Sequence, residues 1–253
     1  MGMALLGFVV GTIGTLIGVG GGFMLIPILL YLFPSHDNVW ISAHSMWVVS
    51  WNATSGSIAY LRSKRVHLRA ALVFIVASLP GSVLGVWLAK MVERRTFELI
   101  FSLAMIVYAI YLLFKRGGAG GQSQMNAQSR LARQLYIKGA LISMFVGFFA
   151  SFFGLGGGVI HVPLLSHVLG FPVHMATGTS HLILAITAWF TTGIHLWTGE
   201  VQLGDPMLWQ LAGGAVVGAQ VGARLSQKVS GKVILRFLAI ALLLVGVRIL
   251  LRG

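Results

Sequence analysis

The chain has 253 residues, of which 57% are hydrophobic and 9% are charged, and its mean hydropathy is +0.90. This composition excludes an ordinary soluble domain, in which about 25% of residues are charged, and predicts an integral membrane protein. The formal charge of +13 would suggest nucleic-acid binding in a soluble protein, but here Lys and Arg lie between apolar runs, as the positive-inside rule expects. We therefore expect a lipid bilayer as partner and no nucleic acid.

The apolar stretches form the same series twice. They cover 2–33, 40–61, 70–91 and 96–114, and then 138–169, 173–198, 207–227 and 232–251. Glycines interrupt the first stretch of each series. Residues 115–134 between the two series are basic and rich in Gly, Ser and Gln, which is typical of a connector with little fixed structure. We expect a first transmembrane repeat over 1–114, a linker over 115–137 and a second transmembrane repeat over 138–253.

The two interruptions have nearly the same sequence. "GVGGGFMLIP" occupies 18–27 and "GLGGGVIHVP" occupies 154–163, and Ser45 has its counterpart in Ser180 at nearly the same spacing. Consecutive glycines allow a sharp turn with positive φ and leave backbone N–H groups uncovered. The helix that follows each turn directs its positive dipole end at it, so two such starts brought together could hold an anion. The expected backbone donors are Gly20, Gly21, Gly22, Gly156, Gly157 and Gly158.

These glycines have two other interpretations. A nucleotide-binding loop would follow a β-strand and carry a Lys, and neither motif does. Close helix packing is a second interpretation of glycine in membrane helices. For the regularly spaced Gly7, Gly11, Gly14 and Gly18, and for Gly81 and Gly85, we expect packing, whereas for the two triple-glycine cores we expect anion binding.

The interrupted stretches also predict the topology. Each has about 32 residues, which is long for one membrane span and short for two, so we expect a re-entrant hairpin. The loops 62–69, 115–138 and 224–236 then share one face and carry 13 of the 18 Lys and Arg. The split would be 11 to 7 if both stretches spanned the membrane. The predicted fold is an all-α integral membrane protein of two inverted repeats, each a re-entrant hairpin followed by three transmembrane helices, with both chain ends extracytoplasmic.

The polar residues indicate an anion as substrate. The five acidic residues, Asp37, Glu93, Glu98, Glu200 and Asp205, lie near segment ends, whereas a cation pump would usually keep a carboxylate within the membrane. We expect no metal site, no cofactor and no catalytic residues. Hydroxyl and imidazole groups concentrate on 40–61 and 173–198, where the expected substrate contacts are Ser45, Asn52, Thr179, Ser180 and His181. His181 could link transport to proton movement, or it could be a buried histidine with a structural role.

The paired "GxGGGxxxxP" motifs, "ATGTSH" at 176–181 and its weaker echo "ISAHSM" at 41–46 resemble the TauE/SafE family of sulfite exporters and related permeases. The resemblance covers essentially the whole chain. It implies a multi-pass transporter of the bacterial inner membrane that exports sulfite or another small sulfur-containing anion, such as an organosulfonate, and not an enzyme. We expect alternating access. An anion channel that uses the same site as a selectivity filter is the alternative, and a homodimer is possible.

Overall fold

The computed structural model describes residues 2–114 and 129–251, which form ten α-helices and one π-helical segment, with no β-strand in these two ranges. The first half contains α1 (Gly2–Ile17), α2 (Gly22–Leu32), α3 (Asn38–Arg62), α4 (Leu68–Ala89) and α5 (Arg94–Phe114). The second half contains α6 (Ser129–Phe153), α7 (Gly158–Pro163), the π-helical segment η1 (Leu164–Val168), α8 (Val173–Trp197), α9 (Pro206–Leu225) and α10 (Gly231–Leu250).

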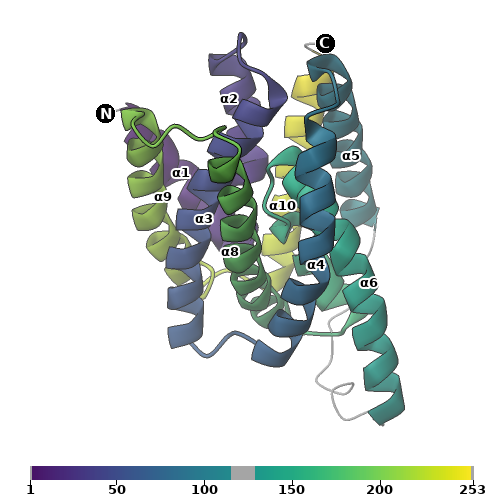
Figure 1. Cartoon of the computed structure of the whole chain (residues 1–253). Helices are drawn as coiled ribbons and strands as arrows, with labels where there is room; N and C mark the ends of the chain where they lie inside the picture. The colour runs from purple at the N-terminus through teal and green to yellow at the C-terminus, as the bar shows by residue number, and fades with distance from the viewer. Residues whose placement is uncertain (1, 115–128, 252–253) are drawn as a thin grey trace.

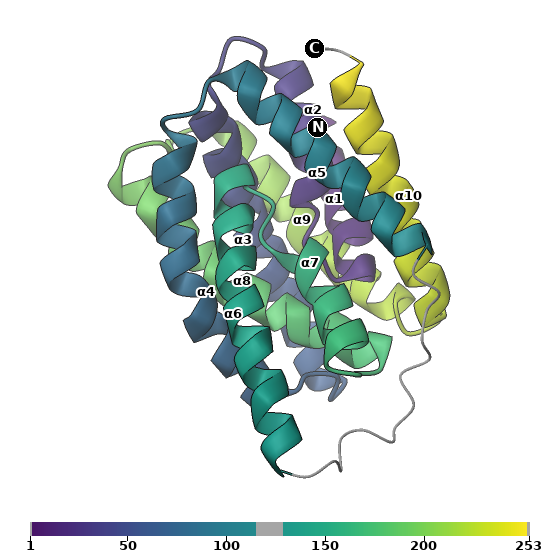
Figure 2. The same cartoon turned by 90° about the vertical axis from the view of Figure 1, so that its right-hand side faces the viewer.

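Both glycine-interrupted stretches reverse direction inside the bundle. In Figure 1, α1 runs down from the upper end and α2 returns to it. In Figure 2, α6 rises from the lower end and α7 turns back toward it. The start of α1 and the end of α10 both lie in the upper part of the bundle, while the connection between α3 and α4 lies at the lower end (Figure 1).

The helices of the two halves pack against one another. α1 lies along α9, α4 along α6 and α5 along α10, while α3 and α8 contact each other in the middle. Glycine makes the first two of these contacts close: a Cβ added to Gly11 would lie 2.7 Å from the Ala215 carbonyl oxygen, and one added to Gly85 would meet the backbone of Phe148. Gly7 and Gly81 approach α9 and α6 in the same way. The packing role expected for Gly7, Gly11, Gly81 and Gly85 is confirmed, because small residues let membrane helices approach. Gly14 packs instead against the backbone of Gly21 in the same hairpin, and Gly18 lies in the first turn itself, where its φ of 86° also requires glycine.

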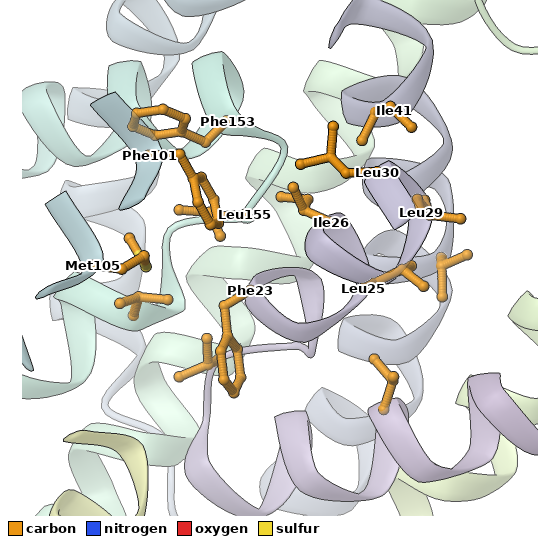
Figure 3. Close-up of a cluster of buried hydrophobic side chains, with 14 of the residues drawn as sticks. Phe23, Leu25, Ile26, Leu29, Leu30, Ile41, Phe101, Met105, Phe153 and Leu155 are labelled. Carbon is orange, nitrogen blue, oxygen red and sulfur yellow. The ribbon is translucent and has the colours of Figure 1, made fainter. Parts of the chain in front are cut away.

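Helix α2 is buried among the other helices. Its side chains Phe23, Leu25, Ile26 and Leu29 are fully buried. Figure 3 shows Ile41 of α3 on the same side of the view as Leu29, and side chains of α5 and of the second half on the other side. A helix that is apolar on every face is stable in such a position, because it has no face that prefers water.

Four helical segments of the described chain are long and apolar enough to cross a membrane: Leu68–Ala89, Arg94–Phe114, Tyr136–Phe153 and Lys232–Leu250. They expose large apolar side chains, such as Val76 on α4, Val107 on α5 and Leu244 on α10. Three of them, in α4, α5 and α10, are among the six full spans expected from the sequence. The fourth, Tyr136–Phe153, belongs to α6, the first helix of the second hairpin. The other three expected spans, α3, α8 and α9, contain more polar residues than α4, α5 and α10. α3 packs against α8 and α9, and α9 also packs against α1.

The acidic residues mostly stabilise helix ends. Asp37 and Asp205 each accept a hydrogen bond from a backbone amide at the start of α3 and α9, at 2.8 Å in both cases. Glu98 and Glu200 pair with Arg94 and Lys90 at 2.8 and 3.1 Å. Their positions near segment ends thus have a structural reason.

Helix α6 begins inside the stretch that the sequence analysis assigned to the linker. Residues 115–128 lie outside the described residues, but 129–137 belong to α6, which begins at Ser129. The expectation of little fixed structure over 115–134 is therefore wrong for 129–134, which are helical. This stretch, "SRLARQ", contains Leu, Ala, Arg and Gln, which favour helix, and its polar composition outweighed that preference in the sequence analysis.

Candidate functional site

The two glycine motifs fold into the same backbone turn. Three glycines in each turn have positive φ angles between 71° and 86°: Gly18, Gly20 and Gly21 in the first, and Gly154, Gly156 and Gly157 in the second. The amide of Val19 donates to the Gly14 carbonyl at 2.8 Å, and the amide of Leu155 donates to the Ala150 carbonyl at 2.9 Å. Because these bonds occupy equivalent positions of the two motifs, the sequence repeat is also a repeat of local structure.

The two turns touch each other at the start of α2 and α7. A Cβ added to Gly22 would lie 2.8 Å from the carbonyl oxygen of Leu155 in the second turn. One added to Gly158 would lie 2.6 Å from the carbonyl oxygen of Gly18 in the first turn. The turns therefore meet backbone to backbone, and no guest fits between these two glycines in this arrangement.

Ser45 and Ser180 tie the turns to the central helices in a crosswise manner. The Ser45 hydroxyl on α3 donates to the Gly154 carbonyl at 2.8 Å, and the Ser180 hydroxyl on α8 donates to the Gly18 carbonyl at 3.2 Å. Each serine thus holds the turn of the opposite half. Both are fully buried, and in this arrangement their hydroxyl hydrogens are engaged with the turns.

Two apolar side chains cover one side of the paired turns. Val49 of α3 and Leu184 of α8 occupy equivalent positions in the two halves, each about one helical turn after its serine. Leu184 would contact a Cβ on Gly20 or on Gly156, and Val49 Cγ1 lies 3.3 Å from the first of these positions and 2.7 Å from the second. The structure therefore has the turns closed against each other and against an apolar layer.

The six expected backbone donors fall into two groups. The amides of Gly20 and Gly156 donate to the Gly14 and Ala150 carbonyls within their own turns, at 3.1 and 3.4 Å. The other four amides, at the start of α2 and α7, have no hydrogen-bond partner among the described residues. They belong to Gly21, Gly22, Gly157 and Gly158. The described chain thus leaves these four N–H groups without an acceptor while the turns are closed against each other.

Asn52 and His181 lie in a polar cluster beside the first turn. The Asn52 side-chain amide donates to the carbonyls of Gly11 and Ala215, at 3.1 Å each, and its oxygen accepts from the Thr15 hydroxyl at 3.0 Å. The same hydroxyl lies 3.4 Å from His181 Nε2. All of these side chains are fully buried, and His181 Nδ1 has no hydrogen-bond partner in the described chain.

Two members of this cluster were not anticipated from the sequence. Thr15 joins Asn52 to His181, and Tyr60 donates to the Thr15 carbonyl at 2.7 Å while its ring meets the His181 ring edge-on at 5.5 Å. Thr15 could have been found, because Ser151 carries a hydroxyl at the equivalent position before the second motif. Tyr60 gives no such signal.

Thr179 lies apart from the turns. Its hydroxyl oxygen accepts a hydrogen bond from the His67 amide at 2.9 Å, in the connection between α3 and α4. The structure thus gathers the glycines, Ser45 and Ser180 at one junction, with Asn52 and His181 beside it, and puts Thr179 at the end of the bundle.

The junction lacks charged side chains. None of the buried residues in 2–114 and 136–251 is Asp, Glu, Lys or Arg. Any ion held here would interact with backbone dipoles, hydroxyls, an amide and an imidazole, and not with a charged side chain.

A helical bundle with lipid-facing apolar helices and a neutral polar centre of this kind is a multi-pass membrane protein, and comparison with known proteins identifies it as a transporter. The chain belongs to the TauE/SafE family: the family profile described as "Sulfite exporter TauE/SafE" matches residues 3–249. The resemblance seen in the sequence is thus confirmed.

Individual relatives carry consistent names. The "Probable membrane transporter protein YunE" of Bacillus subtilis (strain 168) is 28% identical, with the match covering 99% of this chain and 97% of that protein. A "Probable membrane transporter protein" of Xylella fastidiosa (strain 9a5c) is 28% identical over 74% of this chain and 69% of its own length. The "Probable membrane transporter protein MJ0441" of Methanocaldococcus jannaschii is 25% identical, with 74% and 68% covered. No solved structure gives a significant match.

Proposed function

We propose that this chain is a secondary transporter that exports a small sulfur-containing anion, sulfite or an organosulfonate, by alternating access. The observation that carries the proposal is the meeting of the two glycine turns in the middle of the bundle, each held by a serine from the opposite half. Inverted repeats in transporters commonly hold substrate at such a meeting point of broken helices. We take the halves to be inverted repeats, 1–114 and 138–253, with re-entrant hairpins at their starts.

In this proposal the structure is the closed, unloaded form. Substrate binding separates the turns and releases the hydroxyls of Ser45 and Ser180 from the turn carbonyls. The anion is then bound by these hydroxyls and by the amides of the two triple-glycine segments, Gly20–Gly22 and Gly156–Gly158. Asn52 and His181 border the site on the side of the first turn, and Thr179 contacts substrate only if α8 rotates.

The orientation follows from charge. The connections 62–69 and 224–236 and the segment 115–138 carry most of the Lys and Arg, which assigns this end to the cytoplasm. The membrane is then the bacterial inner membrane, and both termini are extracytoplasmic. A homodimer remains part of the proposal. The closed contact between the turns favours a carrier over a channel, because a channel needs a continuous path in its conducting state.

Thermal unfolding of the purified protein with a panel of anions tests the proposal. A ligand at about 100 times its Kd stabilises the folded protein by about 2.7 kcal/mol, so binding is readily detected. We expect sulfite, thiosulfate or sulfoacetate to raise the unfolding temperature and chloride to leave it unchanged. Efflux of the stabilising anion from proteoliposomes then tests transport, and saturation with concentration separates a carrier from a channel.

A pair of variants connects the binding to the junction. In the double variant Ser45→Ala, Ser180→Ala the anion loses two donors, each contributing about 1.5–3 kcal/mol to a charged partner, while the unloaded form loses two neutral bonds to turn carbonyls of about 0.5–1.5 kcal/mol each. The difference, about 1 kcal/mol per serine, should lower the apparent affinity about tenfold or more. Ser102→Ala is the matched control, because this buried hydroxyl donates to the Leu99 carbonyl of its own helix at 2.9 Å. If no sulfur anion binds, or if both variants bind equally well, the proposed function or the proposed site is wrong.

A further inference from the structure

An apolar cavity of about 400 Å³ lies between α5 and the second hairpin. Met105 and Tyr108 of α5 form one wall, Phe149 and Ala150 of α6 form another, and Gly157 of the second turn closes the inner end. The Tyr108 hydroxyl donates to the Val159 carbonyl at 3.0 Å, so this polar group is satisfied by the protein. Figure 3 shows Met105 across from Leu155, another residue of the lining.

The cavity runs from the lipid-facing surface to the second glycine turn. Val107 and Tyr111, which also line it, are 66% and 46% exposed, whereas Met105, Ala150 and Leu155 are buried. Val107 lies on α5, which is one of the helices apolar enough to span a membrane. In a bilayer, the mouth of this cavity therefore faces lipid hydrocarbon and not water.

The first turn is packed more tightly at the equivalent position. A Cβ added to Gly21 would lie 2.6 Å from Val10 Cγ1 and 2.7 Å from the Val10 carbonyl oxygen. At Gly157 the nearest atoms are 3.3 Å or more away, and one of them belongs to Val146, the repeat equivalent of Val10. The second hairpin thus lacks packing that the first one has. An unfilled space beside it would forfeit the dispersion contacts of its lining.

We propose that the cavity binds the end of one acyl chain of an anionic phospholipid. The position of the cavity along α6 supports a lipid chain as its occupant. Lys138 is exposed on α6, and Phe149 follows it by about three helical turns, on the same side of the helix and about 16 Å along the axis. One leaflet of the hydrocarbon core is about 15 Å thick. A phosphate beside Lys138 therefore places the end of its acyl chain at the cavity, against Gly157.

Photo-crosslinking of the full chain in nanodiscs tests this site. The probe is phosphatidylglycerol with a diazirine at the end of one acyl chain, and adducts are mapped by peptide mass spectrometry. We expect adducts to concentrate on Met105, Tyr108 and Phe149. Ala104→Phe, which fills the cavity from α5, should reduce them about tenfold, the change that corresponds to about 1.4 kcal/mol.

Two comparisons keep the test decisive. Leu103→Phe is the matched control, because Leu103 is on the same helix, 52% exposed and outside the cavity, and it should leave the adducts unchanged. In the unmodified protein, moving the diazirine next to the glycerol should move the adducts toward Lys138, a readout that does not depend on a variant folding. Adducts spread evenly over the exposed side chains of α4, α5 and α10 would overturn the proposal.

Discussion

Gly158→Ala is the sharpest perturbation of the contact between the two turns. The added Cβ would lie 2.6 Å from both the carbonyl oxygen of Gly18 and Cα of Val19, whereas ordinary contacts begin at 3.4 Å. Both neighbours are backbone atoms, and Ser180 holds the Gly18 carbonyl in place. They cannot move aside as a flexible side chain would. Overpacking of this kind costs about 1–3 kcal/mol, against at most about 1 kcal/mol gained from the higher helix propensity of Ala.

We therefore expect Gly158→Ala to lower the free energy of unfolding by about 1–2 kcal/mol, or the unfolding temperature by several degrees. Thermal unfolding in detergent measures this, and proteoliposome transport should fall in parallel. Gly193→Ala in α8 is the control, since a Cβ there has no neighbour within 4 Å. It should be as stable as the parent or more so. If the two variants are equally stable and equally active, the turns do not meet as described.

Two further predictions concern the interactions that join the helices. Asn52→Ala removes three interhelical hydrogen bonds. Such a bond contributes about 0.6 kcal/mol within a membrane, so this variant should lower the free energy of unfolding by about 2 kcal/mol in an SDS titration. Thr12→Val, which loses a bond within its own helix, should lower it much less. Arg94→Gln removes a guanidinium that donates to several carbonyls at the end of α2 and should cost about 1–3 kcal/mol. Lys90→Gln removes one pair with the partly exposed Glu200 and should cost at most about 1 kcal/mol; the reverse order would contradict this assignment.

The turns were the most predictable part of the site. Consecutive glycines that recur at the same place in each half require unusual backbone, and the positive φ angles occur where the motifs lie. The pairing of Ser45 with Ser180 was also visible in the sequence. Their actual partners were not, because each serine binds a carbonyl in the other half of the chain, far away in sequence.

The expected contact of Thr179 conflicts with helix geometry, which could have been recognised from the sequence. Consecutive residues of an α-helix point about 100° apart, so Thr179 and Ser180 cannot both face the same turn. Once Ser180 faces the Gly18 carbonyl, Thr179 must point elsewhere, and it receives the His67 amide. In this arrangement Ser180 and Thr179 therefore cannot both contact a substrate bound at the turns. Ser45 and Asn52, two helical turns apart, share a face of α3 and both reach residues of the hairpin regions.

The crosswise serines also restrict how the closed form can open. α3 holds the second turn through Ser45, and α8 holds the first turn through Ser180. The close contacts of α1 with α9 and of α6 with α4 are made by glycines against backbone, which leaves little freedom for sliding. We infer that separating the turns requires α3 and α8 to shift against each other. A covalent link between these two helices should then block transport.

Ser50 and Thr192 provide that link, since their hydroxyl oxygens are 2.9 Å apart across α3 and α8 and two bonded sulfurs are about 2 Å apart. The chain has no cysteine, so Ser50→Cys, Thr192→Cys introduces one defined pair. After oxidation we expect transport to stop, and after reduction to return to the level of the two single-cysteine variants, which should not respond to the oxidant. Full transport by protein that is quantitatively crosslinked would show that α3 and α8 move as one unit, and that the turns separate in some other way or not at all.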